Sequence, residues 1–234
     1  MMYLIAFLIP IILLVGVYLY NWQCRLPIKQ MLISFSFGVL AALFCFCWFI
    51  FNEDYSPKPD TIIQAITSVM LNSAIPEECI KWMVLSVLLI IGYKRNLYNT
   101  HYSVIMCAVC ISMGLAALEN VLYLLKNEHM IGTIIGRAIM SVPGHCCDAI
   151  WMGYFCSIAK FEHSKYWWAI PMSLIIPIMF HFVYNLSIKL ISVIDYGWLD
   201  NALLLWLPIY TICLCILSFR ILKKTKNQAF FSPN

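Results

Sequence analysis

The chain has 234 residues, of which 63% are hydrophobic and only 11% are charged. A soluble domain of this length does not have that balance, so the composition predicts a polytopic membrane protein. The formal net charge is +4. No basic run is interleaved with exposed aromatic residues, which argues against nucleic acid as a partner.

Seven hydrophobic segments follow one another at residues 3–22, 31–51, 62–93, 102–125, 132–158, 167–192 and 200–222. We expect an all-α transmembrane bundle of about seven spans, in which residues 1–234 form one integral membrane domain. The first segment lacks a basic leader and a small-residue cleavage site, so we interpret it as a retained helix. In the third segment, residues 61–75 are moderately polar, and Pro76 fits the first turn of a second helix, so this span is predicted to be two-part.

The basic residues predict how the spans are oriented. Ten of them fall on one side and three near the other. The first group is Arg25, Lys29, Lys94, Arg95, Lys160, Lys165, Arg220, Lys223, Lys224 and Lys226, and the second is Lys58, Lys126 and Lys189. Because cytoplasmic loops carry the excess of lysine and arginine, we expect the N-terminus outside the cell and the C-terminus in the cytoplasm.

Four polar clusters interrupt these apolar segments. They are Glu77-Glu78 with Lys81, Glu119-Asn120 with Tyr123, His145 with Asp148, and His181 with Asn185. An ionisable side chain in hydrocarbon is costly and usually faces a bundle interior or a wet cavity, so each cluster is a candidate functional site. Arg137, near the outer end of the fifth segment, has two interpretations: it anchors a carboxylate or substrate backbone, or it snorkels to the interface.

The clusters are predicted to share one depth in the membrane. Measured along each helix from its cytoplasmic end, the heights are about 24 Å for Glu78, about 27 Å for Glu119, about 22 Å for His145 and about 20 Å for His181. The topology rests on lysines and arginines alone, so this agreement is an independent indication. We therefore expect the clusters to meet in the outer half of the membrane.

Spacing within the first two clusters predicts local partners. Glu77 and Lys81 are one turn apart and are expected to pair, which leaves Glu78 free to act as a base or a ligand. Tyr123 lies one turn after Glu119 and is expected to hydrogen-bond its carboxylate or to stabilise an oxyanion.

The two histidine clusters give similar expectations. Pro143-Gly144 precedes His145 and is expected to kink or loosen its helix. Asp148 is expected to orient an imidazole, and Asn185, one turn after His181, is expected to orient that ring.

These groups support two schemes of amide hydrolysis, and the residues leave both open. In one, a buried glutamate deprotonates water and a histidine stabilises the oxyanion. In the other, a divalent metal such as zinc is held by a set drawn from Glu78, Glu119, His145 and His181, and the second glutamate acts as the base. The chain has no HExxH motif and no GxSxG elbow, which argues against zincin and serine chemistry.

The clusters resemble the motifs of the PrsW family of intramembrane proteases, which is distantly related to the CAAX prenyl endopeptidase and bacteriocin-processing group. The matching stretches are EExxK at 77–81, GLAALENVLY at 114–123, RAIMSVPGHCCDAIWMGY at 137–154 and HFVYN at 181–185. The resemblance implies a catalytic set of Glu77, Glu78, Glu119, His145 and His181. The supporting residues are expected to be Lys81, Asn120, Tyr123, Arg137, Asp148 and Asn185, within a catalytic core at about 61–192. Asn185 stands where the family commonly has Asp, so it brings no charge to the histidine.

The resemblance also implies a function. It is the cleavage of a single-pass, membrane-anchored protein near its extracytoplasmic face, as the first cut in regulated proteolysis; in PrsW-type proteins the substrate is an anti-sigma factor. Two other functions are considered: a non-proteolytic member that binds a peptide as an immunity or scaffolding protein, and a proton-coupled transporter. The intact set of acids and histidines argues against the former, and the lack of paired inverted repeats argues against the latter.

Overall fold

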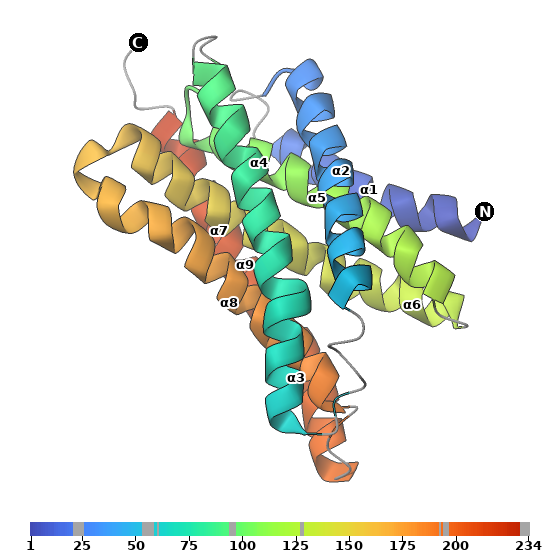
Figure 1. Cartoon of the computed structure of the whole chain (residues 1–234). Helices are drawn as coiled ribbons and strands as arrows, with labels where there is room; N and C mark the ends of the chain where they lie inside the picture. The colour runs from blue at the N-terminus through green and yellow to red at the C-terminus, as the bar shows by residue number, and fades with distance from the viewer. Residues whose placement is uncertain are drawn as a thin grey trace.

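All regular structure is helical in the residues that the computed structural model describes, which are 1–20, 26–52, 59, 61–93, 97–126, 129–191, 193 and 197–229. The elements are α1 (Met2–Tyr20), α2 (Ile28–Asn52), α3 (Ile62–Val69), η2 (Met70–Ala74), α4 (Ile75–Tyr93), α5 (His101–Lys126), α6 (Met130–Gly136), η3 (Arg137–Ser141), α7 (Val142–Phe161), η4 (His163–Lys165), α8 (Tyr166–Ile191) and α9 (Gly197–Ala229). Because α3, η2 and α4 join without a loop, as do α6, η3 and α7, the described helices form seven rods (Figure 1). The predicted all-α bundle is confirmed.

Five of the seven rods are long and apolar enough to cross a membrane. They are Met2–Tyr20, Ile28–Phe51, His101–Leu125, His163–Ile191 and Asn201–Lys226. The other two rods carry polar clusters: Glu77, Glu78 and Lys81 lie on α4, and Asp148 lies on α7. The chain is therefore a multi-pass membrane protein.

Helix α5 forms the core of the bundle. In its membrane-spanning stretch 83% of residues are buried, against 17–22% in the other four apolar spans. It packs against α1, α2, α4 and α7. The outer helices leave large apolar side chains exposed, as expected for surfaces that face lipid. Side chains on α5 are thus more enclosed than those on the other four apolar spans, which suits a helix that carries part of a site.

Glycines let α2 and α5 cross at backbone contact. A Cβ atom added at Gly38 would lie 1.9 Å from the carbonyl oxygen of Ile111, and one added at Gly114 would lie 2.1 Å from that of Phe35. No larger residue fits either position without moving a helix. Close approach at small residues is how helices associate in lipid, where no hydrophobic force drives them together.

The third rod widens one turn before Pro76. The Ile75 N–H bonds to the Met70 carbonyl, five residues back, which makes Met70–Ala74 a π-helical turn. Proline lacks an N–H, and its ring clashes with the carbonyl four residues earlier, so a wider turn relieves the conflict. The predicted two-part segment is confirmed, with Pro76 in the first turn of α4, but the parts join without a break.

The fifth rod repeats this device. The Val142 N–H bonds to the Arg137 carbonyl, and Pro143 follows directly. The expected loosening before His145 therefore takes the form of a π-helical turn. Such turns recur at functional sites because they redirect the side chains that come after them.

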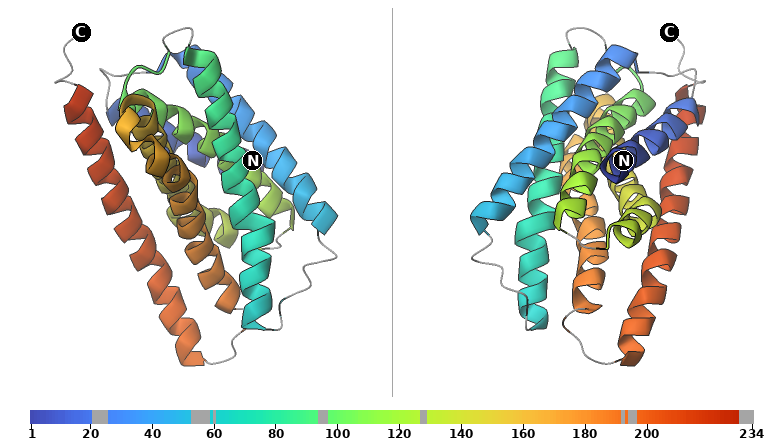
Figure 2. Two further views of the ribbon diagram at one scale, coloured as in Figure 1. Left: turned by 60° about the vertical axis from the view of Figure 1, so that its left-hand side comes forward. Right: turned by 90° about the vertical axis from the view of Figure 1, so that its right-hand side faces the viewer.

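Lysine side chains at one end of the bundle donate hydrogen bonds to backbone carbonyls. Lys226 Nζ donates to the Tyr20 carbonyl at 3.0 Å, and Lys160 Nζ donates to the Tyr98 carbonyl. Figure 2 shows the C-terminal ends of α4 and α9 at this end, and the start of α3 and the end of α8 at the opposite end. This alternation follows the predicted order of the spans; which end faces the cytoplasm stays a prediction.

Candidate hydrolytic centre

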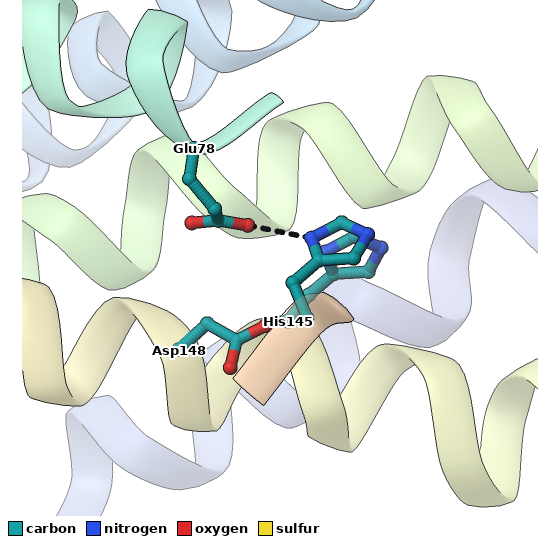
Figure 3. Close-up of side chains that lie close together, drawn as sticks. Glu78, His145 and Asp148 are labelled. Atoms are coloured by element: carbon teal, nitrogen blue, oxygen red, sulfur yellow. Dashed lines mark hydrogen bonds and ion pairs between the residues drawn. The ribbon is translucent and has the colours of Figure 1, made fainter. Parts of the chain in front are cut away.

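Four rods bring the predicted acids and histidines together inside the bundle. Glu78 of α4, His145 of α7 and His181 of α8 are 0%, 6% and 5% exposed. The two imidazole rings lie with centroids 5.3 Å apart at an interplanar angle of 82°. Figure 3 shows the carboxylates of Glu78 and Asp148 approaching the imidazole rings from two helices. Glu119 of α5 joins them through His145, so the expected meeting of four helices is present in the geometry.

Lys81 and His181 both contact the carboxylate of Glu78. Its Oε1 accepts from Lys81 Nζ at 2.5 Å and lies 2.7 Å from His181 Nδ1. The predicted pairing of Lys81 with Glu77 is therefore wrong. Helix positions i+3 and i+4 are both within reach of a lysine, and the carboxylate of Glu77 is directed toward Ser73 on the preceding turn.

Ser73 connects three members of the site, although nothing in the sequence motifs singles it out. Its hydroxyl donates to Glu77 Oε1 at 3.0 Å, lies 3.2 Å from His181 Nε2 and accepts from Asn185 Nδ2 at 2.7 Å. Asn185 therefore reaches His181 through Ser73, so the expected orienting role would act through that hydroxyl. The available signal was spacing, because Ser73 precedes Glu77 by one turn.

Arg137 lies against a carboxylate, the first of its two predicted arrangements. Its Nη2 is 2.9 Å from Glu119 Oε2, and the same oxygen is 2.9 Å from His145 Nε2. The guanidinium carbon also stands 4.1 Å from the centre of the Tyr123 ring, a cation–π contact. Glu119 is thus clamped between a guanidinium and an imidazole.

Glu78 Oε2 and Asp148 Oδ1 are buried carboxylate oxygens that have no hydrogen-bond partner among the described residues. Leaving such groups unpaired in a buried place is costly, so the site suits a cation. One ligand atom each from Glu78, His145, Asp148 and His181 lies within 4.8 Å of the others. Two imidazole nitrogens with two carboxylate oxygens form a donor set typical of zinc. These residues could therefore hold a divalent metal ion.

The grouping differs from the predicted ligand set in one member. Asp148 stands where Glu119 was expected. Among the residues that the structure describes, Glu119 belongs instead to a second group with Glu77 and His145. The reason is position on α7: Asp148 follows His145 by one turn, so both face the gap between α4 and α8.

A cavity of about 750 Å³ opens onto the cluster. Glu77, Glu119, His145, Asp148 and His181 line it. Three glycines also line it, namely Gly132, Gly136 and Gly144, and a Cβ added at any of them would meet nothing within 4 Å. These glycines therefore leave open space instead of packing two helices together, and the volume is in the range of small-ligand and peptide sites.

Comparison with known proteins points to one family. A family model described as "PrsW family intramembrane metalloprotease" matches residues 26–214. "Protease PrsW" of Halalkalibacterium halodurans is 36% identical over 118 residues, which cover 50% of this chain and 52% of the relative. The protein of the same name from Geobacillus kaustophilus is 30% identical over 162 residues, 68% of this chain and 67% of the relative. That from Bacillus subtilis is 26% identical over 183 residues, 77% of this chain and 79% of the relative. No solved structure matches the chain.

Proposed function

Because the chain belongs to the PrsW family of intramembrane metalloproteases, we propose that it is an endopeptidase that cuts a single-pass membrane protein near its extracytoplasmic face. The observation that carries this proposal is the meeting of acids and imidazoles from four helices at one cavity. By resemblance, the substrate is of the anti-sigma-factor type. The catalytic core spans about 61–192, and the chain sits in the cell membrane with its N-terminus outside.

Glu78, His145, Asp148 and His181 are the proposed metal-holding residues. A zinc ion held by these residues would polarise a carbonyl oxygen as a Lewis acid. Glu119 has a supporting role in this proposal. Its carboxylate, 2.9 Å from His145 Nε2, fixes the orientation of that ring. Carboxylate partners of this kind commonly orient ligating histidines.

Glu77 is the proposed general base. Its Oε2 has no hydrogen-bond partner among the described residues, and its side chain lines the cavity. Glu78 does not line the cavity, and Glu119 Oε2 is shared by Arg137 and His145, so Glu77 is the carboxylate best placed to take a proton. In the proposed step, Glu77 Oε2 accepts a proton from the attacking water and returns it to the leaving amine.

The open glycines are the proposed substrate-facing surface. Without side chains at Gly132 and Gly136, the backbone of a substrate segment can approach α6 closely on its way to the cluster. The cavity then presents the peptide bond to Glu77 while apolar helices exclude bulk water.

A large side chain at Gly136 is expected to obstruct the binding of substrate and to leave the proposed metal site intact. We expect Gly136→Leu to lower the cleavage rate of a single-pass anti-sigma factor in vesicles about 100-fold, because a small displacement of substrate has effects of that order. Zinc binding by the purified protein should stay unchanged. The measurement is the rate of product formation on gels, with zinc content determined in parallel.

Gly16→Leu is the matched control. Gly16 is exposed on α1, and a Cβ added there also meets nothing within 4 Å, but it does not line the cavity. This variant should cleave at the wild-type rate. Equal rates for the two leucine variants would contradict a substrate path along α6.

A further inference from the structure

Helix α1 contacts the candidate site although it lies outside the matched segment 26–214. The contact is made by Asn120 of α5, which is 2% exposed. Its Nδ2 donates to the carbonyl oxygen of Ala6 at 3.0 Å. A backbone carbonyl within a helix is normally taken by the N–H four residues later, so this acceptor needs an explanation.

Pro10 provides that explanation. It lies inside α1, four residues after Ala6. Proline has no N–H, so the helix itself cannot supply the usual donor to the Ala6 carbonyl. In lipid, a freed backbone acceptor must find another partner within the protein. Asn120 is that partner, and the side-chain amide is thereby fixed in one orientation.

The fixed orientation of Asn120 determines what its other end does. Its Oδ1 accepts from Arg137 Nε at 2.5 Å. The guanidinium that it holds is the one that binds Glu119, which in turn binds His145. An amide suits this place because it donates on one side and accepts on the other, which neither a carboxylate nor a hydrocarbon side chain does.

We propose that Asn120, oriented by the Ala6 carbonyl that Pro10 leaves open, is a positioning residue that sets Arg137, and through it the Glu119–His145 pair. We call this series of contacts the α1 support. Its contribution to hydrolysis rests on the proposed function, whereas the contacts themselves do not. The α1 support gives α1 a role in the site, although α1 lies outside the matched segment 26–214.

The kinetic test is a double-mutant cycle on Pro10 and Asn120. Pro10→Ala gives residue 10 an N–H that competes for the Ala6 carbonyl, and we expect kcat to fall about fivefold at unchanged KM, the factor for one neutral hydrogen bond. Asn120→Leu removes a neutral and a charge-assisted bond and should lower kcat about 30-fold. In the Asn120→Leu background, Pro10→Ala should have no further effect.

The cycle is measured with a purified single-pass anti-sigma factor reconstituted in vesicles. Gly16→Ala in the same helix is the control, since it also raises helix propensity but touches no member of the support. It should leave kcat and KM unchanged. Multiplicative losses in the double variant, or an unchanged kcat in Pro10→Ala, would overturn the proposal.

A second readout does not depend on proteolysis. In protein labelled with ¹⁵N-histidine, the resonance that His145→Gln removes reports the His145 ring. We expect it to shift in Asn120→Leu and Pro10→Ala and to stay in place in Gly16→Ala. An unmoved resonance in all three would sink the α1 support. A shifted resonance in a protein that cleaves nothing would uphold the support and reject the proposed function.

Discussion

His181→Ala is expected to lower cleavage of a membrane-anchored substrate about 1,000-fold or more, the range seen when an acid–base group or metal ligand is removed. His181 contacts Glu78 at 2.7 Å and Ser73 at 3.2 Å, and it belongs to the group that fits a metal. The rate is measured on a purified anti-sigma factor in vesicles, and the zinc content of the same preparation should fall with it.

His163→Ala is the control for this substitution. His163 lies in η4, is exposed and has no part in the cluster. It should retain the wild-type rate and zinc content. If His181→Ala cuts as fast as His163→Ala, the imidazole on α8 does not take part in hydrolysis.

Lys81→Met is expected to destabilise the fold by about 3–5 kcal/mol, the typical effect of removing one partner from a buried ion pair. The side chains of Lys81 and Glu78 are 2% and 0% exposed, so the substitution removes the ammonium from a buried carboxylate that then has only His181 as a partner among the described residues. The free energy of unfolding is measured by denaturant titration of the protein in mixed micelles. Adding Glu78→Gln should recover much of the loss, because it removes the buried charge.

Lys165→Met provides the comparison, because Lys165 and Glu162 form a pair with the same i, i+3 spacing. Their side chains are 49% and 36% exposed. Water compensates such a pair, so its loss should produce no measurable change in stability. Similar effects of the two lysine substitutions would mean that burial of the Lys81–Glu78 pair contributes nothing.

The sequence was sufficient to predict the helices and the fact that the polar residues of four of them meet. Both depend on local quantities, namely the length of apolar runs and the rise of 1.5 Å per residue. Thus Glu78, Glu119, His145 and His181 could be brought together without coordinates. Their catalytic roles stay predictions, because proximity alone does not distinguish a base from a ligand.

The direction in which each side chain faces could not be predicted. Two candidate partners for Lys81 differ by one residue in spacing, and the π-helical turn before α4 rotates the side chains of α4 in a way that hydropathy does not reveal. The sequence indicates only an orienting role for Asp148, because its neighbours on α4 and α8 are known only once the helices are packed. The contact between Asn120 and Ala6 is a long-range one, and Pro10 in an apolar helix was its one local sign.

The most direct measurement of the central claim is a map of the N-termini of membrane proteins in cells that express the wild type, Glu78→Gln or His181→Ala. We predict that the wild type generates new N-termini in single-pass proteins, near the extracytoplasmic boundary of their transmembrane segments, and that both variants lack them. An identical set of N-termini in all three strains would contradict the account.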